Sequence, residues 1–157
     1  MESSKITHSI ADIQQEIKVE IISSRYNNEV VAMLKNSCIS NLNKIDDKFI
    51  KVSDHDVPGA YEIPVLAKNL ILRRQPDVII ALGAIIRGET AHFEIVANSC
   101  SISLCSLSTS YGLPIIFGVL TVENMEQAIY RADPNKGDKG GEAAYTAIEM
   151  VQKIRTF

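Results

Sequence analysis

Hydrophobic residues along the chain alternate between strand-like and helix-like spacing. Ile17, Val19 and Ile21 occupy every second position, which is typical of a β-strand. From Val31 to Leu42 the apolar positions recur every three or four residues, which predicts a helix that follows this strand. The same alternation continues to the end of the chain. It predicts further strands at 49–52, 78–86 and 115–120, and further helices at 64–74, 90–111, 123–130 and 144–151.

This alternation predicts an α/β fold. Strands that are separated by helices need crossover connections, and they therefore pair in parallel with helices on both faces of the sheet. We expect a three-layer α/β/α sandwich with a central, mostly parallel four-stranded sheet of the flavodoxin-like topology class. Residues 1–15 show no periodicity and are predicted to form an N-terminal arm, while residues 16–157 form a single domain.

Composition and charge narrow the function classes. A chain of 157 residues with 46% hydrophobic and 22% charged residues matches one folded domain. Its net charge of −3 gives no electrostatic reason to expect a nucleic acid as the partner. Its longest apolar run, Val78 to Ile86, is too short to span a membrane. The start of the chain does not resemble a signal peptide, and the three cysteines form no C-x-x-C pair. These features predict a cytoplasmic protein with small-molecule ligands.

Candidate ligand-binding residues follow the predicted strands. In open parallel sheets, ligands bind at the carboxyl ends of the strands. The residues at these ends are Arg25 to Asn27 after the first strand, Gly59 to Glu62 after the second, Arg87 to Thr90 and His92 after the third, and Thr121 and Glu123 after the fourth.

The group after the third strand carries the most chemistry. Gly88 lets the backbone approach a ligand, and the N–H groups of Glu89 and Thr90 at a helix N-terminus favour an anion such as phosphate. The alternative is that these residues serve only the turn and the helix cap. His92 near the positive helix end favours a neutral imidazole that can accept a proton, although a structural histidine fits the sequence equally well.

Other candidates have structural alternatives too. Tyr26 can stack on a flat heterocycle or pack against the protein, and Glu62 can accept hydrogen bonds from a ligand or be solvated. Arg131 and Lys139 flank a glycine- and lysine-rich loop and can reach a phosphate or remain in solvent. No phosphate loop, G-x-G-x-x-G motif, G-x-S-x-G elbow or metal-ligand spacing occurs. The pattern predicts a metal-free enzyme that acts on a phosphate-bearing small molecule.

Five segments also resemble, in order and at unbroken spacing, the motifs of the lumazine synthase family. They are Arg25–Asn27, Gly59–Pro64, Gly83–Phe93, Phe117–Thr121 and the stretch from Gln127 to Ala144, within a similarity that runs from about residue 16 to residue 153. The resemblance implies the penultimate step of riboflavin biosynthesis. In that step 5-amino-6-ribitylaminouracil condenses with 3,4-dihydroxy-2-butanone 4-phosphate, and phosphate and water are released without a metal or organic cofactor.

The resemblance also implies roles for individual residues. His92 would transfer protons, and Gly88, Glu89, Thr90 and Arg131 would bind the phosphate. The pyrimidine and its ribityl chain would contact Tyr26, Asn27, Ala60, Tyr61, Glu62, Ala84, Ile85, Ile86, Phe117 and Lys139. The family places its active sites between subunits of a homopentamer, so Phe117 and Lys139 would come from a neighbouring subunit.

One segment departs from the family pattern. Members usually have Asn-Lys-Gly before the last helix, whereas this chain has Asp138, Lys139 and Gly140 there. A second Asn-Lys-Gly sequence occurs three residues earlier, at 135–137. We assign the site lysine to Lys139 because its spacing from Arg131 fits the family, which leaves Lys136 as the alternative. The carboxylate of Asp138 would add a negative charge near the phosphate.

Three other functions are compatible with the sequence. The archaeal type of riboflavin synthase shares the expected fold and would dismutate two lumazine molecules without phosphate. A non-catalytic flavin or lumazine binder is the second, although a pure binder does not need a phosphate site beside a base. A structural shell protein is the third, and its catalytic residues would normally persist. A pentamer, a double pentamer and an icosahedral shell all fit the sequence, with the pentamer as the minimal unit.

Overall fold

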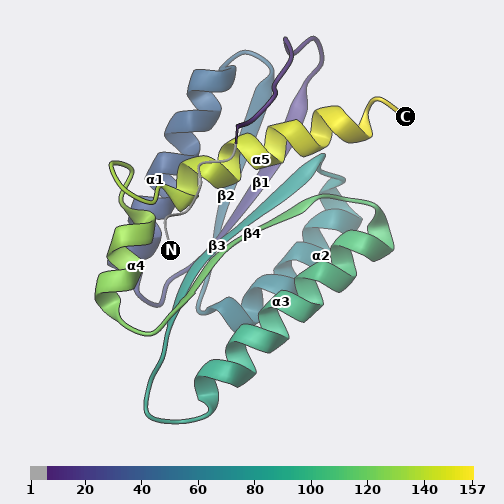
Figure 1. Cartoon of the computed structure of the whole chain (residues 1–157). Coiled ribbons are helices and arrows are strands. Elements are labelled where there is room, and N and C mark those ends of the chain that lie inside the picture. The colour runs from purple at the N-terminus through teal and green to yellow at the C-terminus, as the bar shows by residue number, and fades with distance from the viewer. Residues whose placement is uncertain (1–6) are drawn as a thin grey trace.

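A single parallel sheet forms the centre of the molecule, for which a computed structural model describes residues 7–157. Its strands are β1 (Ile17–Ser24), β2 (Ile50–Val57), β3 (Val78–Ile86) and β4 (Ile115–Val122), hydrogen-bonded in the order β2-β1-β3-β4. Every pair is parallel, which makes the predicted mostly parallel sheet wholly parallel. Figure 1 shows the strands side by side with helices in front and behind.

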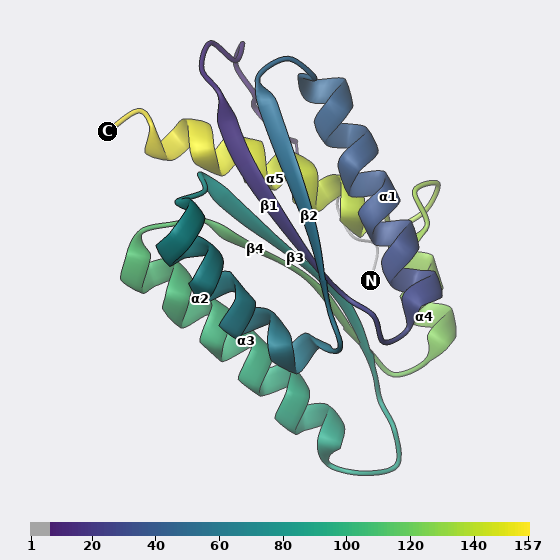
Figure 2. The same ribbon diagram turned by 180° about the vertical axis from the view of Figure 1, so that it is seen from behind.

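Helices cover both faces of the sheet, as the alternating pattern predicted. The helices are α1 (Asn28–Ile45), α2 (Ile63–Arg74), α3 (His92–Tyr111), α4 (Met125–Ala132) and α5 (Lys139–Ile154), with a short 3-10 helix, η1 (Ala60–Glu62), before α2. Figures 1 and 2 show α1, α4 and α5 on one face and α2 and α3 on the other. This confirms the three-layer fold. No helix within residues 7–157 is long and apolar enough to cross a membrane.

The hydrophobic core is divided by the sheet into two clusters. One contains Leu34 of α1 and Ile148 of α5, and the other contains Ile63 of α2 and Leu104 of α3. Strand β3 is buried along almost its whole length because it lies inside the sheet and between both helical layers. Its continuous apolar sequence predicted this burial.

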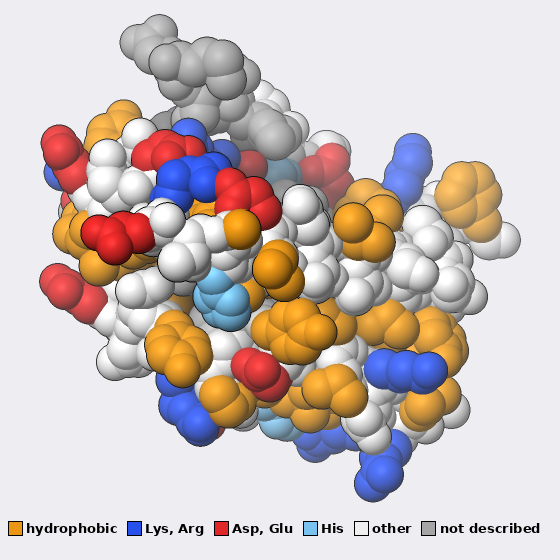
Figure 3. All heavy atoms as spheres, turned by 90° about the horizontal axis from the view of Figure 1, so that it is seen from below, with side chains coloured by type: hydrophobic (Ala, Val, Ile, Leu, Met, Phe, Trp, Pro, Cys, Tyr) orange, Lys and Arg blue, Asp and Glu red, His pale blue; other side chains and the backbone are white. Residues whose placement is uncertain are grey.

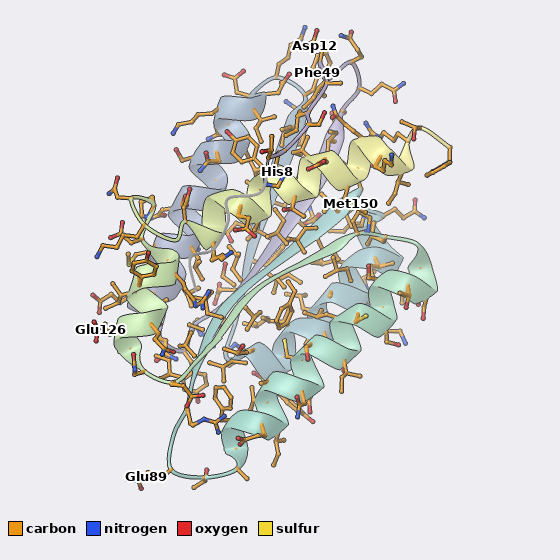
Figure 4. The ribbon with its side chains drawn as sticks, viewed as in Figure 1. His8, Asp12, Phe49, Glu89, Glu126 and Met150 are labelled. Atoms are coloured by element: carbon orange, nitrogen blue, oxygen red, sulfur yellow. The ribbon has the colours of Figure 1, made fainter. Side chains whose placement is uncertain are left out.

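The described part of the predicted arm lies against α5. Ala11 exchanges two hydrogen bonds with the Gln152 side chain, at 3.0 and 2.7 Å. His8 contacts the Glu149 carboxylate at 2.8 Å and stacks on Tyr145 (Figure 4). Residues 1–6 lie outside the described residues. The segment from residue 7 to residue 16 is therefore held by side chains of α5 without forming regular secondary structure.

An ionic cluster inside the sheet departs from the sequence expectation. Glu20 of β1 is only 5% exposed. Its carboxylate lies 2.5 Å from His55 Nε2 and 3.4 Å from Arg74 Nε. The second strand was predicted to end at residue 52, but β2 continues to Val57 and includes His55. Burial of the carboxylate is tolerated because both partners reach it from adjacent elements.

Candidate functional site

A hollow of about 720 Å³ lies at the carboxyl ends of β1 and β3, and we call it the strand-end hollow. This is the position at which parallel sheets bind ligands. Most residues predicted for the site line it together. Its lining consists of Ser24, Tyr26, Asn27, Gly59, Ala60, Tyr61, Glu62, Ala84, Ile85, Ile86, Gly88, Thr90, His92, Phe93, Ile95 and Val96.

The turn after β1 is tied to β3 by Asn27. The backbone of Asn27 is left-handed, with φ 56°, and its side-chain amide donates to the carbonyl of Ala84 at 2.8 Å. This places Tyr26 at the rim of the hollow, where its side chain is 72% exposed. A Cβ on Gly59 would lie 3.1 Å from a carbon of the Tyr26 ring. The glycine therefore leaves room for a ring that retains a large exposed surface for stacking.

Glu62 is held by the backbone of its own turn. Its Oε2 accepts a hydrogen bond from the N–H of Gly59 at 2.8 Å, which fixes the start of η1. The carboxylate is therefore an oriented group in the hollow, and the expected default of a solvated side chain does not describe it. Tyr61, beside it, is 59% exposed.

Arg87 anchors the loop that connects β3 to α3. Its guanidinium binds Glu123 at 2.8 Å and Glu94 at a shorter distance, and it lies 4.2 Å above the Phe93 ring. Hydrogen bonds to Glu94 and then Glu123 raise the pKa of Arg87, and the Arg87 hydrogen bond lowers the pKa of Glu94. The sequence analysis placed Arg87 among the candidate residues after the third strand but gave it no specific role. The structure shows that its charge is compensated by carboxylates and that it holds the base of the loop.

The loop itself presents backbone groups to the hollow. Helix α3 begins at His92, so Glu89 and Thr90 precede the helix instead of forming its first turn. Within residues 7–157 the N–H groups of Gly88, Glu89 and Thr90 donate to no protein acceptor. The side chain of Glu89 points away from the molecule (Figure 4), and Glu89 does not line the hollow, whereas Gly88 and Thr90 do. A Cβ on Gly88 would meet nothing within 4 Å.

His92 is the one imidazole among the residues that line the strand-end hollow. Its backbone N–H lies 3.4 Å from the Thr90 hydroxyl oxygen, which closes the turn into α3. The imidazole makes no hydrogen bond to another residue of the described chain and is exposed. A ring without a protein partner is available for proton transfer to a ligand.

Glu89 lines neither this hollow nor the next one, whereas three other predicted residues line a different hollow of about 660 Å³, which we call the β4–α5 hollow. It contains Phe117 of β4, Arg131 of α4 and Lys139 of α5. Lys139 Nζ lies 2.6 Å from a Glu142 carboxylate oxygen, whereas Arg131 has no ion-pair partner within residues 7–157. Lys136 does not line this hollow. It pairs with Asp133 at 3.7 Å and lines an adjoining depression with Arg131 and Lys139.

The two hollows share no lining residue. Within one chain, Arg131 therefore does not join Gly88 and Thr90 in the phosphate site that the sequence predicted. Phe117 and Lys139 are likewise separate from Tyr26 and His92. Residues 7–157 contain no group of three or more His, Cys, Asp or Glu side chains placed to hold a metal ion.

A comparison with known protein families identifies the family of the chain. The sequence model of 6,7-dimethyl-8-ribityllumazine synthase matches residues 16–155, which include both hollows and the loop between β3 and α3. The match confirms the resemblance found in the sequence motifs. It also confirms the enzyme class expected from them. The chain therefore belongs to the 6,7-dimethyl-8-ribityllumazine synthase family.

Proposed function

We propose that the strand-end hollow binds both substrates of the lumazine synthase reaction. The family's reaction is the penultimate step of riboflavin biosynthesis. The observation that carries the proposal is that one hollow combines an exposed aromatic ring with backbone N–H groups and an imidazole that have no hydrogen-bond partner in the described part of the chain. Together they match a flat heterocycle, a phosphate and a proton to be transferred.

The pyrimidine occupies the side of the hollow formed by β1 and β3. Tyr26 stacks on the ring, and the backbone of Ala84 to Ile86 faces the ring edge. The ribityl chain lies along η1, where the oriented Glu62 carboxylate accepts hydrogen bonds from hydroxyl groups. These contacts orient the amine nucleophile toward the loop that precedes α3.

The phosphate of the second substrate binds at that loop. The backbone N–H groups of Gly88, Glu89 and Thr90 donate to phosphate oxygens, and the Thr90 hydroxyl adds a further donor. Because the Glu89 side chain points outward, its charge does not oppose the anion at close range (Figure 4). His92 then lies within the same hollow as the phosphate loop.

The chemistry depends mainly on orientation. An amine and a ketone react readily once they are held together, and positioning converts their encounter into an intramolecular step. His92 accepts and returns protons as water and phosphate leave. The scheme consists only of proton transfers and the departure of water and phosphate.

We further propose that a second subunit completes the site. Arg131 is cationic and has no ion-pair partner among residues 7–157. Together with Phe117 and Lys139 it lines a hollow that, within one chain, is separate from the phosphate loop. Large apolar side chains are exposed on α2 and α3, among them Val65, Leu72, Ile95 and Ile102. Figure 3 shows exposed apolar side chains adjoining one another on one face of the molecule. A homo-oligomer, minimally a pentamer, would cover such residues and bring Arg131 to the phosphate of its neighbour.

The cytoplasm is the proposed location. All three cysteines are free thiols in the described chain, and two of them are buried. Burial, with a smaller contribution from nearby Asp138, raises the pKa of Cys38 to about 12, and burial raises that of Cys100 to about 11. Protonated, buried thiols suit a reducing compartment and need no pairing.

Joint measurement of lumazine absorbance and free phosphate tests the proposed function. Purified protein is mixed with the ribitylaminouracil and the butanone phosphate, and both signals are expected to rise together above the spontaneous rate. Formation of riboflavin from lumazine without phosphate release would instead identify a riboflavin synthase. A folded, oligomeric protein that produced neither signal would be a binder or a shell protein.

Gly88→Ala is expected to weaken phosphate binding without changing the stability of the protein. A Cβ at this position meets no protein atom within 4 Å, and the backbone does not have a left-handed φ, so the variant should fold as well as the parent. The methyl group would instead occupy space needed by the phosphate. We expect the apparent affinity for the butanone phosphate to fall about tenfold, with the unfolding midpoint unchanged. Unchanged affinity in steady-state kinetics would remove Gly88 from the phosphate site.

His92→Ala is expected to lower kcat by no more than about 100-fold, the low end of general acid–base effects. Because both substrates are already reactive, most acceleration comes from their orientation. Single-turnover measurement of lumazine formation isolates this step from product release. A much larger loss in a folded variant would show that proton transfer dominates the acceleration.

A further inference from the structure

Asp138 has an unusual backbone for a residue with a side chain. Its φ and ψ are 42° and 47°, in the left-handed region, and it forms the N-cap of α5 immediately before Lys139. Asparagine and aspartate enter this region more readily than other residues with side chains, but the conformation still needs support. Asp138 lines neither of the two hollows that contain Lys139. Its side chain therefore makes no direct contact with a ligand in either hollow.

The carboxylate of Asp138 is bound by both α1 and α5. The Ser37 hydroxyl of α1 donates to Asp138 Oδ1 at 2.5 Å, and the N–H of Gly141 donates to the same oxygen at 3.1 Å. The Asn41 amide in turn donates to the backbone carbonyl and hydroxyl oxygens of Ser37, at 2.9 and 3.2 Å. The negative charge therefore faces buried donors and the positive end of α5, and is directed away from the β4–α5 hollow.

Close backbone packing makes this contact rigid. A Cβ on Gly140 would overlap the carbonyl oxygen of Leu34, and a Cβ on Gly141 would overlap the Asp138 carboxylate. The first turn of α5 thus lies directly on the backbone of α1. Lys139 is placed between the capping residue and the glycine that touches α1, so its Cα has little freedom to move.

The contact between Ser37 of α1 and Asp138, which we call the clamp, is connected to Arg131 by the turn that precedes Asp138. The N–H of Asp138 donates to the Asp133 carbonyl at 3.0 Å, and the N–H of Gly137 donates to the Tyr130 carbonyl at 3.0 Å. A Cβ on Gly137 would lie 2.6 Å from the Cα of Arg131. The turn from residue 133 to residue 138 therefore packs tightly on the end of α4 and holds the backbones of Arg131 and Lys139 in a fixed relation.

We propose that Ser37 and Asp138 are positioning residues that fix Lys139 relative to Arg131 in the β4–α5 hollow. The inference rests on the proposed role of these two cations in substrate binding. It assigns the Asp138 carboxylate a function opposite to the one its charge suggests. The carboxylate supports the cationic site through α1 and does not weaken phosphate binding by repulsion.

Four variants test this assignment through steady-state kinetics at a temperature well below unfolding. Ser37→Ala removes the donor from α1, and Asp138→Gly removes the carboxylate while relieving the left-handed backbone. We expect each to lower kcat/KM about tenfold, the size of a lost hydrogen bond to a charged group. Asp138→Asn keeps an acceptor and should stay within about twofold of the parent. The double variant Ser37→Ala/Asp138→Gly should lose no more than either single variant, because both break the same contact.

Ser40→Ala is the matched control, because Ser40 lies on the same helix and is exposed. It should leave kcat/KM and the unfolding midpoint unchanged. Parental kcat/KM in folded Ser37→Ala and Asp138→Gly, with only a lower unfolding midpoint, would reduce the clamp to a stabilising contact and overturn the assignment. Severalfold tighter inhibition of Asp138→Asn by inorganic phosphate would overturn it as well, because direct repulsion would then act.

Arg131→Ala and Lys139→Ala distinguish failure of this inference from failure of the proposed function. If those variants lower kcat/KM and the clamp variants do not, the cations act in the site without the clamp. If neither cation matters, the β4–α5 hollow is not part of the active site, and the positioning role fails with it.

Discussion

Gly140→Ala is expected to lower the free energy of unfolding by about 3 kcal/mol, at the upper end of overpacking effects. Gly140 is buried in the first turn of α5, where its added Cβ would overlap the carbonyl oxygen of Leu34. The obstacle is backbone and cannot rotate away, so α5 would have to move from α1. Alanine favours a helix over glycine by about 1 kcal/mol, which offsets only part of this cost. Urea unfolding at a fixed protein concentration measures the difference.

Gly88→Ala supplies the control for this measurement, because the same methyl group there meets no protein atom. We expect its unfolding free energy to stay within about 0.5 kcal/mol of the parent. A Gly140→Ala variant as stable as Gly88→Ala would show that α1 and α5 can separate without cost. Such a result would also weaken the rigid placement of Lys139.

Arg131→Ala is expected to raise the KM of the butanone phosphate about 100-fold while raising that of the pyrimidine much less. The guanidinium has no ion-pair partner within residues 7–157, so its removal leaves no buried carboxylate unpaired. The loss therefore falls on ligand binding and not on folding. Initial rates with each substrate varied in turn measure the two constants. Equal losses for both substrates in a folded variant would contradict a specific phosphate role.

Lys136→Ala is the matched control for this series. Lys136 belongs to the same turn as Lys139 but does not line the β4–α5 hollow, and it pairs with Asp133. Its loss should change the KM of either substrate by less than about twofold, whereas Lys139→Ala should weaken binding. The comparison also decides which of the two lysines serves the site.

Mixing of subunits tests whether Arg131 acts on a neighbour's phosphate. Gly88→Ala alters the strand-end hollow, and Arg131→Ala alters the β4–α5 hollow. If each active site combines hollows from different chains, about a quarter of the sites in randomly mixed oligomers carry no substitution. Activity of the mixture would then exceed that of either variant alone. A mixture no more active than the average of its components would place both hollows in one chain's own site.

Much of the strand-end site could be predicted from the sequence. Parallel strands bring their carboxyl ends to one edge, so residues after each strand were expected to meet there. Tyr26, Glu62 and His92 do line one hollow, although they lie far apart in the chain. Their individual roles stay proposals, because the structure places them without a substrate.

Two sets of ion pairs could not be predicted from the sequence. Nothing in the sequence indicated that Glu20 is buried and contacts His55 and Arg74. Nothing in the sequence indicated that Arg87 is held by Glu94 and Glu123. These pairings join residues from different elements, so their partners become known only when the elements are packed.

The sequence by itself determined the order of strands and helices, the parallel sheet and the family to which the chain belongs. Such properties follow from periodicity, crossover geometry and motif order, all of which are local or sequential. Only the tertiary structure decided that Arg131, Phe117 and Lys139 line a hollow separate from Gly88 and His92. It also decided that the Asp138 carboxylate faces Ser37 and not the β4–α5 hollow. Side-chain direction depends on how helices pack against the sheet, and close contacts such as that of Gly140 with Leu34 set this packing.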